Sequence, residues 1–386
     1  MGEAIRVGVL FSRTGSYGVL GQAMHAGAML AFDEIAASGL GVALEPVVVD
    51  PGGRMADYVE GARGLLLDGV THVVGCYTSS SRKEVVPLFE KHDALLWYPS
   101  HSAGFETSEN VIYTGAAPNQ HIVPLTSYLL ETGRRRAWLV GSNYVWAWEN
   151  NRIMREAMLS AGGEVAGERY FPVGDTDLAP VVAQILDARP DFVFNTMIGA
   201  SSYAFLRILR AEAERRGIDQ PLAMPVTSCS LSEPELACLG GAADGHITSS
   251  VYFSSVATPS NARFIAAWRR RWPELGPTSA DAEAPYIAVH LLARAIAAAG
   301  SAGFEAVRAA LPAVSFEAPQ GMVRIDPENR HAFLRPRIGL SQADGTFRIV
   351  AACPSEVRPD PYLVWQPSRE EATPPGGARP GLRLVS

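Results

Sequence analysis

Short apolar runs alternate with longer amphipathic stretches along the first hundred residues of the chain. The apolar runs have the length of buried strands and lie at residues 5–11, 44–49, 71–74 and 94–98. The amphipathic stretches repeat apolar residues at helical spacing and predict helices at residues 21–37, 55–67 and 80–91. Strands and helices that alternate in this way are typical of a parallel sheet with helices on both faces.

A second series of the same kind begins after residue 118. It predicts helices at residues 119–131, 148–161, 178–188 and 200–216. It predicts strands at residues 137–140, 164–171, 192–195 and 222–226. The chain therefore contains two doubly wound halves.

The part after Gly245 has too few strand-like runs for a third sheet. It predicts one strand, then helices at 261–271, 284–299 and 304–311, then short strand-like pieces from 316 to 352. The simplest interpretation is that these helices complete the first half and the last strands return to the second. We therefore predict an α/β fold of two doubly wound parallel-sheet lobes joined by a three-crossing hinge.

The predicted lobes are discontinuous in the sequence. Lobe 1 comprises residues 1–118 and 250–320, lobe 2 comprises 119–249 and 321–365, and residues 366–386 form a Pro/Gly-rich tail that is loosely attached or lies on a neighbour. The crossings are expected near residues 116–120, 245–250 and 319–324.

Hydroxyl and aromatic side chains follow the predicted strands where the strands end. In the first half, Tyr77 and Ser79 follow the third strand, and Tyr98 and Ser100 follow the fourth. Because ligands bind outside the carboxyl ends of strands in such sheets, these four residues are candidates for a small-molecule site. The alternative is that the hydroxyls cap helices and the tyrosines pack at a rim.

The second half places further candidates in the matching loops. Tyr144 and Trp146 follow the strand at 137–140, and Cys229 and Ser230 follow the strand at 222–226. Closure of the lobes would lower the two aromatic residues onto a ligand held by the first half. A rim or core position without ligand contact is the alternative for Trp146.

Composition and motifs argue against several other functions. The formal net charge of −7 disfavours direct binding of nucleic acid, and no apolar run reaches the roughly 20 residues of a membrane-spanning helix. The four cysteines form no C-x-x-C pair, and no G-x-S-x-G, phosphate-loop or H-E-x-x-H motif occurs. Cys76 or a pocket serine lacks a recognisable base, and His101 fits a turn or rim better than catalysis. We expect no enzyme activity, metal or cofactor.

Several short motifs stand in a fixed order along nearly the whole chain. They are Gly75-Cys76-Tyr77 with Arg82-Lys83, residues 93–99, Gly104-Phe105-Glu106, Ala117-Pro118-Asn119-Gln120, Gly141-Ser142-Asn143-Tyr144, Tyr252-Phe253-Ser254-Ser255, Ala318-Pro319-Gln320-Gly321 and Arg358-Pro359-Asp360-Pro361-Tyr362. Their order resembles the amide-sensing negative regulators of bacterial aliphatic amidase operons. The resemblance implies a type I periplasmic-binding-protein fold, related to urea and branched-chain amino acid receptors.

The resemblance also implies roles for the candidate residues. Ser79 would bond the amide, Tyr77 and Tyr98 would enclose its apolar tail, and Tyr144 with Trp146 would form the lid. The family has a tyrosine where this chain has Trp146. It also has threonine, proline and bulkier residues in place of residues 100–103, and a Thr-rich stretch near Cys229 and Ser230. These departures leave the exact ligand open.

The resemblance further implies a cytoplasmic receptor for a small aliphatic amide, or urea, whose lobe closure controls an RNA-binding transcription antitermination regulator. A homo-oligomer is expected. Since residues 1–6 lead directly into a strand, we expect a cytoplasmic protein, or a periplasmic one if an export signal has been removed.

The alternative is the substrate-binding protein of an ABC transporter for urea, short amides or branched-chain amino acids. An amino-acid ligand would need partners for a carboxylate and an ammonium group. Glu149 and Asp175 are acidic candidates for the ammonium.

Overall fold

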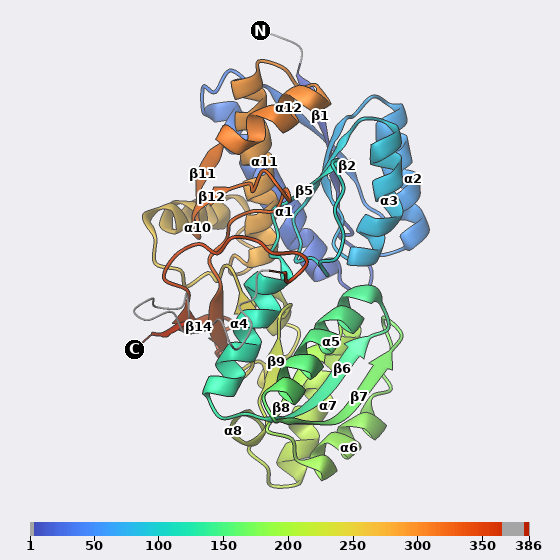
Figure 1. Cartoon of the computed structure of the whole chain (residues 1–386), viewed down its shortest axis with the longest axis vertical. Helices are drawn as coiled ribbons and strands as arrows, with labels where there is room; N and C mark the ends of the chain where they lie inside the picture. Colours follow the sequence, from blue (N-terminus) through green and yellow to red (C-terminus); the bar gives the residue numbers. More distant parts are fainter. Residues whose placement is uncertain (1–3, 365–381, 386) are drawn as a thin grey trace.

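The chain forms two lobes, each built on its own β-sheet (Figure 1). The computed structural model describes residues 4–364 and 382–385. Figure 1 shows the first lobe at the top, with the helices of residues 259–310 beside the N-terminal elements, and the second lobe below. The predicted α/β class with two lobes is confirmed, although the second sheet is mixed and the chain crosses between the lobes more often than the three predicted times.

The first lobe has a five-stranded parallel sheet in the order β2-β1-β3-β4-β5. Its strands are β1 (Ile5–Leu10), β2 (Leu44–Val49), β3 (His72–Gly75), β4 (Leu95–Tyr98) and β5 (Val111–Tyr113). Successive side chains of a strand point to opposite faces. Val7 and Val9 of β1 therefore pack under α1 (Gly18–Ala37) and α11 (Ala280–Ala299), whereas Leu10 packs under α2 (Met55–Leu67) and α3 (Ser79–Lys91).

Later parts of the chain complete this lobe. They are α10 (Pro259–Arg271), α12 (Phe304–Ala310), the short 3-10 helix η2 (Leu311–Ala313) and the hairpin of β11 (Ser315–Ala318) with β12 (Gly321–Arg324). Phe264, Val307, Phe316 and Val323 from these elements join the same core as α1 and α11.

The second lobe has an eight-stranded mixed sheet in the order β15-β14-β13-β10-β9-β8-β6-β7. The parallel strands are β6 (Arg136–Ser142), β7 (Glu164–Phe171), β8 (Phe192–Thr196), β9 (Val226–Ser228) and β10 (Ile247–Ser250). The antiparallel strands are β13 (Arg337–Ser341), β14 (Phe347–Ala352) and β15 (Arg383–Leu384).

Helices cover both faces of this second sheet. One face carries α4 (Pro118–Glu131) and α5 (Val145–Ser160), and the other carries α6 (Ala179–Ala188) and α7 (Ala200–Arg215). Short helices follow at α8 (Gln220–Ala223), α9 (Glu233–Leu236) and the 3-10 helix η1 (Gly240–Ala242).

The predicted strand at 222–226 is wrong over most of its length. Residues up to Ala223 form α8, because the Asp219 side chain caps the Leu222 amide and Pro221 stands in the first turn. The strand begins only at Val226. Strand β5 was not predicted, and α11 begins at Ala280, before the expected residue 284.

The third crossing lies later than predicted. Val323, Ile325, Ala332 and Leu334 belong to the core of the first lobe, so the chain reaches the second sheet only at β13. The predicted boundary at residues 319–324 is therefore wrong, and residues 321–334 belong to lobe 1.

A further segment returns to the first lobe after β14. The Val357 amide donates to the Leu334 carbonyl at 2.7 Å, and the Phe105 amide donates to the Pro361 carbonyl at 2.9 Å. Residues 357–361 thus lie on lobe 1, contrary to the predicted assignment of 321–365 to lobe 2. The predicted tail at 366–386 falls largely outside the described residues, but Arg383–Leu384 adds strand β15 to the edge of the second sheet.

Within the described ranges no single helix is long and apolar enough to cross a membrane. Residues 280–299 and 304–313 meet the length and composition criteria only as a pair, and the two helices are bent by 100° at the break. The four cysteines, all of them described, are free.

Candidate functional site

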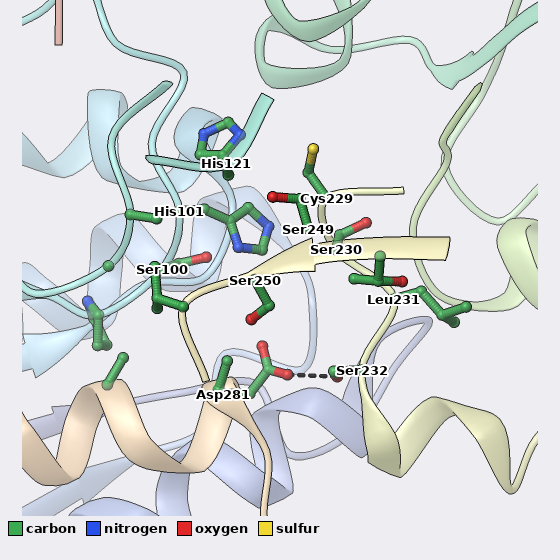
Figure 2. Close-up of a pocket in the computed structure, with 17 residues that line it drawn as sticks. Ser100, His101, His121, Cys229, Ser230, Leu231, Ser232, Ser249, Ser250 and Asp281 are labelled. Carbon is green, nitrogen blue, oxygen red and sulfur yellow. Dashed lines mark hydrogen bonds between the residues drawn. The ribbon is translucent and has the colours of Figure 1, made fainter. Parts of the chain in front are cut away.

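A small cavity lies between the two lobes (Figure 2). Its volume is about 40 Å³, which is room for about three water-sized spheres. Side chains and backbone of both lobes and of the first two crossings enclose it: Pro99, Ser100, His101, Gly115, Ala116, His121, Cys229, Ser230, Leu231, Ser232, Thr248, Ser249, Ser250, Val251, Ala280, Asp281 and Ala284.

Asp281 supplies a carboxylate to this cavity. It stands in the first turn of α11, whose N-cap is Ser279. The Ser232 hydroxyl, which comes from the second lobe, donates to Asp281 Oδ2 at 2.6 Å. Figure 2 shows the other carboxylate oxygen turned toward the cavity. Burial raises the pKa of Asp281 to about 6.

Two further buried carboxyl groups lie on α9. Glu235 Oε2 accepts from the Ser232 amide at 2.9 Å, and Glu233 Oε1 accepts from the Ser254 amide at 2.7 Å. Burial, together with the charge of Asp281, raises the pKa of Glu233 to about 7 and that of Glu235 to about 8. The described lining of the cavity contains no lysine or arginine. This side of the cleft therefore has an excess of acidic groups.

Two neutral histidines line the cavity beside the acidic group. His121 Nε2 lies 3.2 Å from the Ser102 carbonyl oxygen. Because a carbonyl only accepts, Nε2 carries the proton and Nδ1 is left as an acceptor. Burial lowers the pKa of His121 to about 3 and that of His101 to about 4, so both rings are uncharged at neutral pH.

Several buried polar atoms around the cavity have no hydrogen-bond partner among the described residues. They include His121 Nδ1, Thr248 Oγ1 and Ser249 Oγ. Buried polar groups in native proteins are normally paired with protein, water or ligand. These atoms are therefore available to a bound molecule.

Three of the residues predicted from the sequence line the cavity: Ser100, Cys229 and Ser230. Tyr77, Ser79, Tyr98, Tyr144 and Trp146 lie outside its lining. The Tyr98 hydroxyl donates to the Tyr77 carbonyl at 2.7 Å, and Ser79 Oγ accepts from Arg82 Nη1 at 3.3 Å. Ligand contact by these five residues stays a prediction.

The predicted aromatic residues nevertheless gather at the same cleft. Ring centroids lie 6.4 Å apart for Tyr144 and Trp146, 4.9 Å for Trp146 and His101, and 6.4 Å for His101 and Tyr77. This row of rings runs from α5 of the second lobe to the β3–α3 loop of the first. Trp146 is buried within it.

The lobes also make a direct backbone contact. The Ala200 amide at the start of α7 donates to the Ser16 carbonyl of the first lobe at 3.1 Å. Gly199 has φ +58, and a Cβ there would collide with the same Ser16 carbonyl. The lobes are thus in contact across the cleft, as expected for a closed form.

The sequence analysis did not identify Asp281, His121 or the hydroxyls at the end of β10 as lining residues. Ser279 could have revealed Asp281 in the sequence. As an N-cap residue, Ser279 starts helix α11 before the predicted residue 284 and so places Asp281 in its first turn.

Neither acidic residue considered for an ammonium group lines the cavity. Glu149 pairs with Arg152 at 2.9 Å, and Asp175 Oδ1 accepts from the Asp177 amide at 3.0 Å.

Curated relatives match over most of the chain. The Leu/Ile/Val-binding protein homolog 6 of Brucella abortus is 24% identical over 308 residues, which cover 78% of this chain and 77% of the relative. The leucine-, isoleucine-, valine-, threonine- and alanine-binding protein of Pseudomonas aeruginosa is 24% identical over 330 residues, which cover 84% and 86%.

Solved structures share the fold. A solute-binding protein of an ABC transporter from R. palustris, in complex with 4-hydroxybenzoate, superposes with a TM-score of 0.83 at 22% identity and covers 94% of this chain and 100% of that one. A leucine-binding protein from Thermotoga maritima gives 0.78 at 18% identity, with 90% and 98% covered.

The family model for the periplasmic binding protein domain matches residues 5–368. Members of this family are binding proteins without catalytic activity, which confirms the expectation that the chain is not an enzyme. By this match over nearly its whole length, the chain belongs to the periplasmic binding protein family.

Proposed function

We propose that this chain is the substrate-binding receptor of an ABC transporter and closes its two lobes on a small solute. The observation that carries the proposal is the interlobe cavity, which takes its lining from both lobes. The names of the relatives support the transport context, since they describe amino-acid-binding proteins and transporter solute-binding proteins. A ligand that contacts both lobes stabilises the closed form by its differential affinity for that form.

The size of the cavity favours a solute of few heavy atoms. A volume of about 40 Å³ holds about three water-sized spheres, so a solute of about four heavy atoms, such as urea or a short amide, fits after a small outward movement of the lobes. Leucine would need the lobes to stand further apart. The proposed solutes therefore include the small nitrogen compounds in preference to branched-chain amino acids.

Calorimetric titration tests this proposal. The panel is acetamide, propionamide, urea, leucine and 4-hydroxybenzoate, each titrated into the full chain. A variant with a filled cavity, Ser100→Leu, is expected to lose binding of whichever compound binds. Ser38→Leu, at an exposed position outside the cleft, is the matched control and is expected to bind like the wild type. Binding that survives Ser100→Leu would contradict the proposed site.

A second candidate function is the amide sensor implied by the sequence motifs. The observation that favours it is the row of Tyr77, Trp146 and Tyr144 beside a cavity small enough for a short amide. In this proposal a homo-oligomeric receptor binds an RNA-binding antitermination regulator when open and releases it when an amide closes the lobes. Co-purification of such a regulator that is lost on adding acetamide would support it, and light scattering would give the oligomeric state.

The cellular compartment separates the two candidates. A transporter receptor is proposed to work outside the cytoplasmic membrane, and an amide sensor inside it. Fractionation of the native host with an antibody against the chain measures this directly. Recovery in the periplasmic fraction would support transport, and recovery in the cytosol would support sensing.

A further inference from the structure

We propose that the interlobe cavity binds a small organic cation with several N–H donors, of the amidine, guanidine or short alkylamine class. This inference rests on the proposed receptor function and adds the chemical class of the solute. It follows from a carboxylate that faces the cavity, from acceptor atoms left without partners, and from a described lining that holds no basic side chain.

The carboxylate of Asp281 has only neutral hydrogen-bond donors around it. Ser232, which donates to Oδ2, is uncharged, and the residues on the facing helix α9 include the acids Glu233 and Glu235. A buried carboxylate without a cationic partner is costly to keep ionised. A cation that enters the cavity would supply the missing charge, whereas a neutral solute would leave the carboxylate as it is.

The remaining unpaired polar atoms of the cavity can accept hydrogen bonds from N–H groups of a ligand. His121 Nδ1 is an acceptor, as shown by the hydrogen bond of its Nε2 to the Ser102 carbonyl, and it is buried without a partner among the described residues. The hydroxyls of Thr248 and Ser249 can also accept. In Figure 2 the His101 ring lies between His121 and Asp281. A cation with N–H groups on more than one nitrogen matches this distribution better than a point charge.

Other charged ligands fit less well. Within residues 4–364 and 382–385 no group of three or more histidine, cysteine, aspartate or glutamate side chains is arranged to hold a metal ion. A carboxylate ligand would lie beside Asp281 with no lysine or arginine in the described lining. Arg82, which packs against Ser79 and Tyr98 and is paired with Glu106 at 2.9 Å, lies outside this lining.

Pairs of probes with the same shape and different charge test the proposal. Calorimetry on the full chain compares acetamidinium with acetamide and guanidinium with urea, at a pH where both cations are fully protonated. In each pair we expect the cation to bind at least about 10-fold more tightly, the factor expected from one charge-assisted hydrogen bond. Equal affinities, or a preference for the neutral member, would overturn the proposal.

A conservative variant tests whether Asp281 causes the preference for the cation. Asp281→Asn keeps the shape of the side chain and an acceptor for Ser232, and it is expected to reduce the preference to about 2-fold or less, since the charge assistance is lost. Asp177→Asn, at an exposed loop position, is the matched control and is expected to keep it. A cation preference that survives Asp281→Asn in a folded protein, as judged by its melting curve, would overturn the assignment to Asp281. Because the probe pairs use the wild type, the test does not depend on this variant folding.

The same titrations separate this proposal from the proposed function. Binding of leucine or 4-hydroxybenzoate, lost in Ser100→Leu, without binding of either cation would leave the receptor function standing and overturn the cation class. Absence of binding by every compound would overturn both.

Discussion

The hydroxyl of Ser232 donates a 2.6 Å hydrogen bond to the carboxylate of Asp281, and this bond joins the two lobes at the edge of the cavity. Ser232 follows β9 of the second lobe, and Asp281 lies in the first turn of α11 of the first. The Ser232 amide is bound in turn by Glu235. Asp281 and Glu235 are therefore linked through Ser232 where the two lobes meet.

Removal of this interlobe bond should favour the open form. Ser232→Ala loses a hydrogen bond to a charged group, worth about 1.5–3 kcal/mol, and leaves Asp281 without that donor. We expect the affinity for the bound solute to fall by roughly 10-fold or more, measured by calorimetry. Ser301→Ala, at an exposed position of the first lobe, should change it little. An unchanged affinity in Ser232→Ala would show that the bond does not support the closed form.

The acidic groups at the cleft should make stability depend on pH. Burial raises the pKa of Asp281, Glu233 and Glu235 to about 6, 7 and 8, above their values of roughly 4 in an unfolded chain. The folded state then binds protons more tightly. The stabilisation from these groups is complete below their unfolded pKa values and is lost as the pH rises through the folded ones. The pKa values of the neighbouring Tyr77 and Tyr203 are raised, so both side chains stay neutral over the pH range in which these carboxyl groups titrate.

The useful range for this measurement is about pH 7 to about pH 8. Below it, buried histidines with lowered pKa values, such as His101 and His121, change stability in the opposite direction. Burial also raises the pKa of Glu283 to about 8, so the wild type alone does not isolate the cleft. Thermal melts should show a fall in melting temperature across this range that is smaller in Glu235→Gln. Parallel curves for the two proteins would contradict the assignment to Glu235.

The buried cation of the first lobe should be essential for stability. Arg82 is fully buried, with its guanidinium 2.9 Å from Glu106 and 4.6 Å from the ring centroid of Tyr98. Arg82→Met removes the buried partner of Glu106, which keeps Lys83 as a second partner, and is expected to cost about 1.5–3 kcal/mol in urea unfolding. Arg54 pairs with Asp57 at the surface, so Arg54→Met should cost less than about 1 kcal/mol. Similar losses in the two variants would contradict this ranking.

The row of rings should limit the length of the solute. Trp146 is buried and lies 4.9 Å from the His101 ring. Trp146→Tyr vacates space beside the cavity, so we expect a longer amide or amine to bind relatively better, with a loss of about 1–3 kcal/mol in stability. Trp148→Tyr changes an exposed tryptophan of the same helix and should alter neither the chain-length preference nor the stability. An unaltered chain-length profile in Trp146→Tyr would place the ring away from the bound solute.

The alternation of apolar runs was sufficient to predict the fold class. Strands β2 and β7 begin and end at the predicted residues. Helix α8 was not predicted because it has only four residues, and its only sequence signals are the Asp219 cap and Pro221. The return of residues 357–361 to the first lobe depends on contacts with Leu334 and Phe105, distant positions that no local pattern identifies.

The candidate site was predictable only in part. Ser100, Cys229 and Ser230 line the cavity because they follow strands, and that rule can be applied to a sequence. Asp281 does not follow a strand. An acidic residue in a first helical turn is favourable for the helix alone, so its place in a cleft becomes visible only when the lobes are folded together.

A crystal structure with the tightest-binding solute of the panel tests the central claim most directly. The account predicts the solute between the lobes, in contact with Ser100 and Ser230 and within hydrogen-bond distance of Asp281. A solute bound elsewhere, for example in the pocket beside Trp268 and Arg269, with the interlobe cavity unfilled, would contradict it.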